Sequence, residues 1–116
     1  MGGLTTHVLD TAHGCPAAGV TWRLYRLNEE ATLVTEGVTN RDGRVDQPIL
    51  QGDALVAGRY RLEFEAGAYF RSCNVELPNP PFVDQVLIQF GIADTDAHYH
   101  VPLLVSPWSY STYRGS

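Results

Sequence analysis

Hydrophobic and polar residues alternate along most of this chain with a period of two, which is typical of half-buried β-strands. In residues 4–10, Leu4 and Val8 share one face, whereas His7 and Leu9 share the other. Comparable stretches cover residues 20–27, 31–39, 59–65 and 82–92, and two more flank the pair Ser106-Pro107. We therefore expect a protein built mainly from short β-strands.

Turn residues separate these stretches. Asp42-Gly43 supplies the positive φ that a tight reversal needs, and residues 13–16 contain the turn formers glycine and proline. Residues 66–74 are the one segment that predicts a helix. The spacing of about 8–12 residues between strands predicts an all-β, two-sheet sandwich of seven to eight strands with one short helix, in a single domain over residues 1–116.

The strand before Ser106 is apolar on both faces. One face carries Val101, Leu103 and Val105, and the other carries His100, Pro102 and Leu104. A strand that is apolar on both faces is covered on both sides, and in a small two-layer sandwich the second cover comes from another subunit. We therefore expect His100 to lie at an interface between protomers and to meet His7, which is on the outer face of its own strand, in one cleft.

Histidines are the main candidates for chemistry, since imidazoles titrate near neutral pH and suit general acid–base catalysis. The chain has four, His7, His13, His98 and His100. His98 and His100 share one face of a strand about 6.6 Å apart, which also suggests a metal site. Zinc sites need three or four suitably spaced ligands, however, and the sequence has no CxxC or HxxxH motif. We expect no metal, and we expect His13, in a loop, to be exposed or hydrogen-bonded.

Composition and charge exclude several classes of protein. A net charge of −5 with scattered arginines argues against a nucleic-acid-binding protein. The absence of lysine excludes Schiff-base chemistry, and the absence of a Gly-x-Ser-x-Gly motif leaves a serine-nucleophile hydrolase without support. Cys15 and Cys73 lie outside any CxxC spacing and are expected to be free thiols.

Targeting signals are also missing from the sequence. No apolar run approaches the roughly 18 residues that a membrane-spanning helix needs. The first residues lack the charged and apolar regions of a secretory signal. We expect no membrane association and a cytoplasmic protein, or a periplasmic one only if a leader has been removed.

Five segments are similar to the signature motifs of one enzyme family. They are Thr6–Asp10, Gly14–Ala17, Thr39–Arg44, Tyr99–Pro107 and Tyr110–Ser116. Through them the chain resembles the 5-hydroxyisourate hydrolases, the transthyretin-related proteins, over its whole length. The ending Tyr113-Arg114-Gly115-Ser116 is highly specific to the enzymes. Transthyretin itself, a hormone carrier, lacks this ending as well as the two histidines and the arginine of the enzymes.

This resemblance implies a fold, an assembly and a reaction. The fold is a transthyretin-like β-sandwich, and the assembly is a homotetramer in which two edge-to-edge dimers stack around a central channel. This assembly agrees with the strand that is apolar on both faces. The implied reaction is the hydrolysis of 5-hydroxyisourate, the product of urate oxidation, to 2-oxo-4-hydroxy-4-carboxy-5-ureidoimidazoline. No cofactor is implied.

The resemblance also assigns the site. Its catalytic residues fall on His7, Arg44, His100 and Ser116. Its substrate-binding residues fall on His7, Arg44, Tyr113, Arg114 and Gly115. Without the resemblance, Arg44 and Ser116 would be read as surface residues. Two questions stay open at this point, namely which histidine is the general base, and whether Ser116 acts through its hydroxyl or its terminal carboxylate.

Two alternative functions compete with this hypothesis. The first is a transthyretin-like carrier that binds a small hydrophobic ligand in the same channel. A hormone channel, however, has no use for two histidines and an arginine. The second is a metal-dependent hydrolase that uses His98 and His100, which predicts loss of activity with a chelator.

Overall fold

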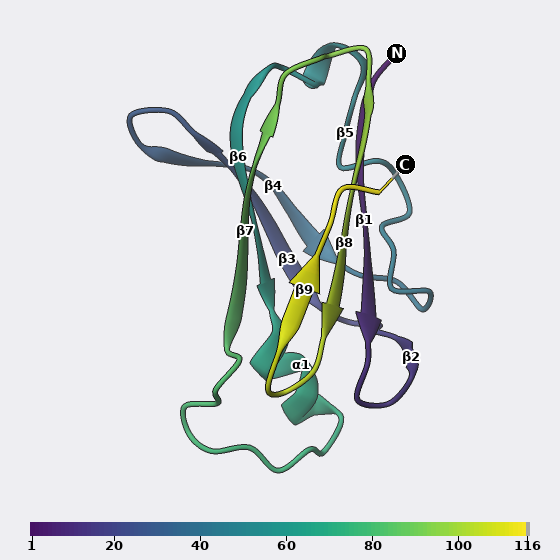
Figure 1. Cartoon of the computed structure of the whole chain (residues 1–116), viewed down its shortest axis with the longest axis vertical. Helices are drawn as coiled ribbons and strands as arrows, with labels where there is room; N and C mark the ends of the chain where they lie inside the picture. The colour runs from purple at the N-terminus through teal and green to yellow at the C-terminus, as the bar shows by residue number, and fades with distance from the viewer. Residues whose placement is uncertain (116) are drawn as a thin grey trace.

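Two β-sheets packed face to face make up most of the molecule (Figure 1), and the computed structural model describes residues 1–115. In spatial order the first sheet contains β2 (Cys15–Pro16), β1 (Gly3–Asp10), β8 (His98–Val105) and β9 (Tyr110–Thr112), and β5 (Leu50–Gln51) also pairs with β1. The second contains β4 (Ala31–Val38), β3 (Thr21–Leu27), β6 (Gly58–Glu65) and β7 (Gln85–Ile92). The predicted all-β, two-sheet sandwich is confirmed.

In the part of the chain that the structure describes, helical structure is limited to two short segments. The helix α1 (Ala66–Ser72) follows β6 directly and lies at the lower end of the sandwich in Figure 1. It ends two residues earlier than predicted. A single 3₁₀ turn, η1 (Gly52–Ala54), follows β5. Within residues 1–115, no helix has the length and apolar character that crossing a membrane requires.

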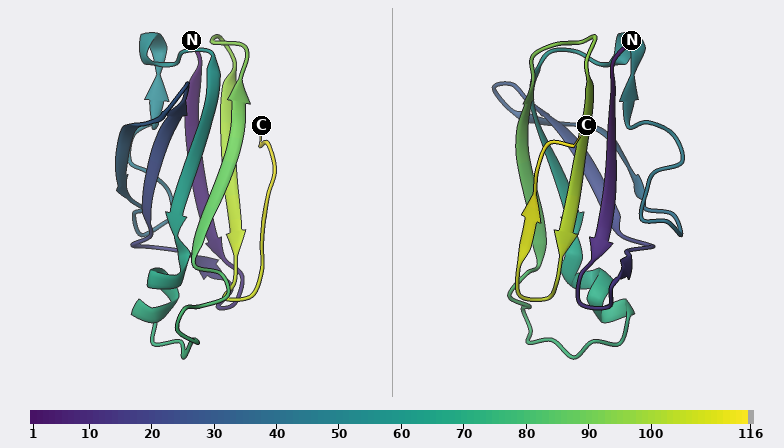
Figure 2. Two further views of the ribbon diagram at one scale, coloured as in Figure 1. Left: turned by 90° about the vertical axis from the view of Figure 1, so that its left-hand side faces the viewer. Right: turned by 45° about the vertical axis from the view of Figure 1, so that its right-hand side comes forward.

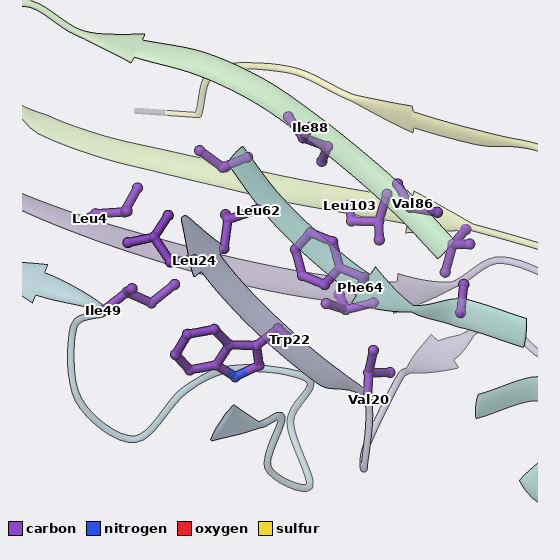
Figure 3. Packing of buried hydrophobic residues seen from close by; sticks show 14 of the residues in the cluster. Leu4, Val20, Trp22, Leu24, Ile49, Leu62, Phe64, Val86, Ile88 and Leu103 are labelled. Atoms are coloured by element: carbon purple, nitrogen blue, oxygen red, sulfur yellow. The ribbon is translucent and has the colours of Figure 1, made fainter. Parts of the chain in front are cut away.

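The hydrophobic core lies between the two sheets, as the period-two pattern predicted. Leu4 of β1 and Leu103 of β8 face Leu24, Leu62 and Phe64 of the other sheet (Figure 3), and all five are fully buried. Alternation then places the intervening residues of β1 and β8 on the outer face of their sheet. Residues on that outer face are available to form a site.

The pairing of β1 with β8 organises this outer face. These strands run parallel and lie side by side (Figure 2, right), although they come from opposite ends of the chain. Their register places Thr5 opposite His100 and His7 opposite Pro102. The pairing therefore brings two histidines from distant parts of the sequence onto one surface.

Two strand predictions need correction. The strand predicted for residues 82–92 begins only at Gln85, because the preceding backbone is paired elsewhere. The amide of Val83 donates to the carbonyl oxygen of Pro107, and the carbonyl of Asp84 accepts from Gly67 in α1. The second correction is that part of the turn predicted for residues 13–16 forms β2, which pairs with the end of β1.

Candidate active site

An open cleft of about 460 Å³ lies on the outer face of the first sheet. Its walls come from β1, β8 and the chain after the turn at residues 40–43, and are formed by Thr5, Thr6, Arg44, Val45, His98 and His100. His7 lies on the same face of β1 as Thr5, two residues further along the strand. The cleft thus combines imidazole, guanidinium and hydroxyl groups.

The turn at residues 40–43 holds Arg44 against β1. Gly43 has a φ of 73°, as predicted for a tight reversal. A Cβ there would overlap the carbonyl oxygen of Val8, so this position needs glycine for close approach as well as for its backbone angle. The amide of Val8 donates to the carbonyl of Gly43 at 2.8 Å, and His7 and Arg44 are bridge partners.

His7 is anchored by the same turn. Its Nε2 lies 2.9 Å from the backbone carbonyl oxygen of Asp42. A carbonyl oxygen can only accept a hydrogen bond, so Nε2 must carry the hydrogen. In the neutral imidazole, the lone pair of His7 is therefore on Nδ1.

His100 is fixed from two sides. On one side, its Nδ1 lies 2.8 Å from the hydroxyl oxygen of Thr5. On the other, the backbone amide of Gly115 donates to the carbonyl oxygen of His100 at 2.8 Å, and a Cβ on Gly115 would come within 2.6 Å of Cδ2 of the imidazole. Only glycine lets the end of the chain pass so close to this ring.

Electrostatics favour neutral histidines in the cleft. Burial, followed by the Arg44 guanidinium, lowers the pKa of His7 below 6.5, and the smaller opposing effects of Asp42 do not restore it. Burial also lowers the pKa of His100, with further lowering by Arg44, His7 and His98 in that order. A neutral imidazole can accept a proton, so both side chains are suited to act as general bases near neutral pH.

The C-terminal segment, residues 113–115, contacts both this cleft and a second cavity. After β9 the chain returns along β8 (Figures 1 and 2). The Arg114 guanidinium stacks 4.3 Å from the centre of the Tyr99 ring, and its Nη2 donates to the carbonyl oxygen of His98 at 3.4 Å. Tyr113 and Arg114 line a cavity of about 240 Å³ between β7 and β8, together with apolar residues such as Phe90.

The structure therefore brings together part of the predicted site. His7, Arg44 and His100 share the cleft region, and Gly115 contacts His100. The side chains of Tyr113 and Arg114 border the neighbouring cavity, and Ser116 lies outside the described residues. Sequence reasoning missed Thr5, whose hydroxyl contacts two histidines. The available signal was its position two residues before His7 on the same face of a strand.

The remaining candidate residues lie elsewhere. His13 is exposed and bonds to Asp10 at 2.6 Å, as expected for a hydrogen-bonded loop residue. Cys15 and Cys73 are free thiols, as predicted. Within residues 1–115, no three side chains of histidine, cysteine, aspartate or glutamate gather closely enough to hold a metal ion. The imidazoles suit the cleft for proton transfer, and the guanidinium of Arg44 suits it for polarising a planar carbonyl group.

Fold and cleft define a transthyretin-like β-sandwich with a polar, histidine-bearing face. The family model described as the HIUase/Transthyretin family matches residues 4–115, and the chain belongs to this family. It is 58% identical to a 5-hydroxyisourate hydrolase of Pseudomonas aeruginosa, over 100% of this chain and 93% of that protein.

Solved structures give the same result. The structure of an (S)-allantoin synthase superposes with a TM-score of 0.94 at 51% identity, over 99% of this chain but only 44% of that longer chain. Sea bream transthyretin in complex with thyroxine superposes with a TM-score of 0.86 at 28% identity, over 97% of this chain and 93% of that chain. Proteins similar to this chain thus include enzymes and a transthyretin in complex with thyroxine, all on one fold.

Proposed function

We propose that this protein hydrolyses 5-hydroxyisourate. The observation that carries the proposal is the meeting of His7, Arg44 and His100 at one cleft, in a chain 58% identical over its whole length to a 5-hydroxyisourate hydrolase. The product would be 2-oxo-4-hydroxy-4-carboxy-5-ureidoimidazoline. No cofactor takes part in this scheme.

In the proposed mechanism, water attacks the C6 carbonyl of the six-membered ring. One neutral imidazole of the pair His7 and His100 removes a proton from the water as its oxygen bonds to C6. The C6–N1 bond then breaks, and N1 takes up the proton that this imidazole removed from water, either directly or through the other neutral imidazole. C6 becomes a carboxylic acid, which loses its proton to solvent. The lowered pKa of each histidine supports the base role, since both imidazoles start neutral.

Arg44 would stabilise the oxygen on which negative charge develops. Its guanidinium is permanently charged and presents a rigid fork of donors that suits planar carbonyl or imide groups. The turn that bridges it to His7 supports this role, because it fixes the arginine backbone beside the base. Tyr113 would narrow the entrance, and Arg114 and Gly115 would form the adjoining wall.

Ser116 completes the proposed site. It would orient the substrate or the attacking water through its hydroxyl or its terminal carboxylate. The position of Gly115 against the imidazole of His100 supports this role, since the next residue follows directly. Deleting residues 114–116 should therefore abolish activity, and a truncated protein with normal turnover would exclude a role for the C-terminus.

We further propose a homotetramer formed as a dimer of dimers. Support comes from the outer face of β8, where the apolar side chain of Leu104 stays partly exposed in the single chain. A second copy packed over this face would narrow the open cleft and shield it from bulk solvent. Sedimentation analysis should give four chains per particle, and a monomer with full activity would contradict the proposal.

The central test follows the ultraviolet absorbance of freshly prepared 5-hydroxyisourate with and without the protein. The proposal predicts faster decay with the protein and an unchanged rate after EDTA treatment. Loss of activity with EDTA would instead favour the metal-dependent alternative at His98 and His100.

A carrier is the second candidate, because the transthyretin structure that resembles this chain contains thyroxine. Calorimetry with thyroxine tests it directly. Binding without any turnover of 5-hydroxyisourate would favour the carrier. The polar cleft argues against this outcome, since a hydrophobic ligand would leave the imidazoles and the guanidinium without partners.

A further inference from the structure

The hydroxyl group of Thr5 lies between two imidazoles. Its Oγ1 is 2.8 Å from Nδ1 of His100 and 3.2 Å from Nε2 of His98. The parallel register of β1 and β8 creates the first contact, because Thr5 is directly opposite His100. The ring of His98, which makes the second contact, lies over Gly3, and its Nδ1 is 3.5 Å from where a Cβ would be, an ordinary van der Waals distance.

The number of hydrogens and lone pairs on the Thr5 hydroxyl restricts which nitrogens of the two imidazoles can carry a hydrogen. A threonine hydroxyl has one hydrogen and two lone pairs, so it can donate to at most one of the two imidazole nitrogens, and it can accept from one or from both. Two arrangements also use the hydrogen of the hydroxyl within the cluster. Either His100 donates from Nδ1 and Thr5 donates to His98, or His98 donates from Nε2 and Thr5 donates to His100.

We propose that Thr5 is a positioning residue for His100, and that its hydroxyl accepts from Nδ1–H of His100 while donating to Nε2 of His98. This proposal rests on the hydrolase function proposed above. The arrangement leaves the lone pair of His100 on Nε2, which has no hydrogen-bond partner within residues 1–115. The opposite arrangement places a hydrogen on Nε2 and removes its capacity to act as a base.

The other groups that face His100 are His7 on β1, Arg44 after the turn and Gly115 of the C-terminal segment. None of them replaces Thr5 as the hydrogen-bond partner of Nδ1 of His100 within residues 1–115.

A pair of matched variants tests the role of the hydroxyl. Thr5→Val keeps the shape and removes the hydroxyl, whereas Thr5→Ser keeps the hydroxyl. We expect Thr5→Val to lower kcat by about 10–100-fold, the usual cost of losing a group that orients a functional histidine. The KM should stay within about twofold, because Thr5 is not assigned a substrate contact. Thr5→Ser should retain the wild-type kcat and the wild-type pH profile.

Long-range ¹H–¹⁵N correlation spectra of the imidazoles provide a readout that is independent of turnover. Wild type and Thr5→Ser should hold His100 in the Nδ1–H tautomer at pH 8, and Thr5→Val should populate the Nε2–H tautomer. Circular dichroism and sedimentation would confirm that each variant keeps its fold and assembly.

Each outcome decides the proposal. An Nε2–H tautomer for wild-type His100, or an unchanged tautomer and kcat in Thr5→Val, would overturn it. Equal losses in Thr5→Val and Thr5→Ser would point to packing instead of the hydroxyl and would also overturn it. If the wild-type protein does not hydrolyse 5-hydroxyisourate, the proposed function fails, while the spectra still decide whether Thr5 sets the tautomer of His100.

Discussion

Strand β1 contributes residues to two clusters that contain histidines. The clusters differ in how many of their polar atoms have hydrogen-bond partners within the protein. At the last residue of this strand, the carboxylate of Asp10 is buried and accepts four hydrogen bonds from within the protein. The donors are the amides of Ala12 and His13, Nδ1 of His13, and the Tyr69 hydroxyl, at 2.6–3.0 Å. In the cleft, by contrast, His100 faces a cation, two other imidazoles and the hydroxyl of Thr5.

Pairing determines the protonation behaviour of each environment. Burial alone would raise the pKa of Asp10, but the hydrogen bonds from Tyr69 and His13 outweigh burial and lower it below 3.8. The carboxylate therefore stays ionised with its lone pairs occupied. Burial, followed by the hydrogen bond to Asp10, raises the pKa of Tyr69. In the cleft, burial and Arg44 keep His100 neutral, with one nitrogen available. We call a cluster saturated when its polar atoms all have hydrogen-bond partners within the protein. Such a cluster stabilises the fold, whereas a cluster with an unpaired nitrogen can bind a substrate.

The sharpest test of this contrast removes one histidine at a time. His7→Ala and His100→Ala should each lower kcat by about 10²–10⁴-fold, the usual contribution of a general acid or base. His13→Ala is the matched control, because its imidazole contacts Asp10 and not the cleft. Steady-state kinetics on folded protein measures all three. Near-full kcat in either cleft variant would remove that residue from the mechanism, and a comparable loss in His13→Ala would break the contrast itself.

Breaking the saturated cluster should affect stability and leave the chemistry intact. Asp10→Asn should lower the free energy of unfolding by about 3 kcal/mol. The substitution removes a buried charge, and the NH₂ group of the asparagine cannot accept the hydrogen bonds that the carboxylate oxygen accepted. Tyr69→Phe, which removes one donor, should cost about 1–2 kcal/mol. Urea unfolding at one fixed protein concentration measures both. A loss of kcat in folded Asp10→Asn without loss of stability would assign this cluster to catalysis.

The direction in which the stabilising effect of Asp10 changes with pH adds a second check. The pKa of Asp10 is lower in the folded protein than its ordinary value of 3.8, so the unfolded chain binds more protons in that range. Its stabilisation is present above pH 3.8 and is lost as the pH falls through the folded-state pKa. Asp10→Asn should therefore flatten the acidic limb of the stability curve, and an unchanged limb would contradict the lowered pKa.

Much of the fold could be predicted from the sequence because burial follows the local period. Leu4 and Val8 are fully buried and His7 and Leu9 are half-buried, as alternation requires. The start of β7 at Gln85 could not be predicted, since it depends on where the preceding amides find partners in the folded protein. The parallel pairing of β1 with β8 is also non-local, and no turn or spacing near either strand specifies it.

The candidate site was less accessible to sequence reasoning. Alternation placed His7 and His100 on outer faces, but Arg44 emerged only from the family resemblance. Thr5 was missed because its importance depends on the residue across the strand pair, and the register sets that neighbour. The direction of the Arg114 side chain was equally inaccessible, since alternation ends with β9 and stacking on Tyr99 decides where the guanidinium lies.

A smaller effect should come from the glycine that packs against the cleft. Gly115→Ala would place a Cβ 2.6 Å from the imidazole of His100, so either the ring or the C-terminal segment must shift. We expect about a tenfold loss of kcat/KM, because displacements of this size in a catalytic group are costly. Gly91→Ala is the control, since a Cβ there meets no atom within 4 Å. Equal activity in both variants would show that the close approach of Gly115 is not needed.

The smallest expected effect concerns the pH profile of the cleft. Since burial and Arg44 lower the pKa of both His7 and His100 below 6.5, their neutral forms persist below that pH. The acidic limb of kcat/KM, which reports the free enzyme, should therefore fall below pH 6.5. Arg44→Gln removes the positive charge and should move this limb toward higher pH in the residual activity. A limb that stays in place would mean that Arg44 does not set the pKa of the two histidines, and would leave it only its proposed role at the oxygen of the substrate.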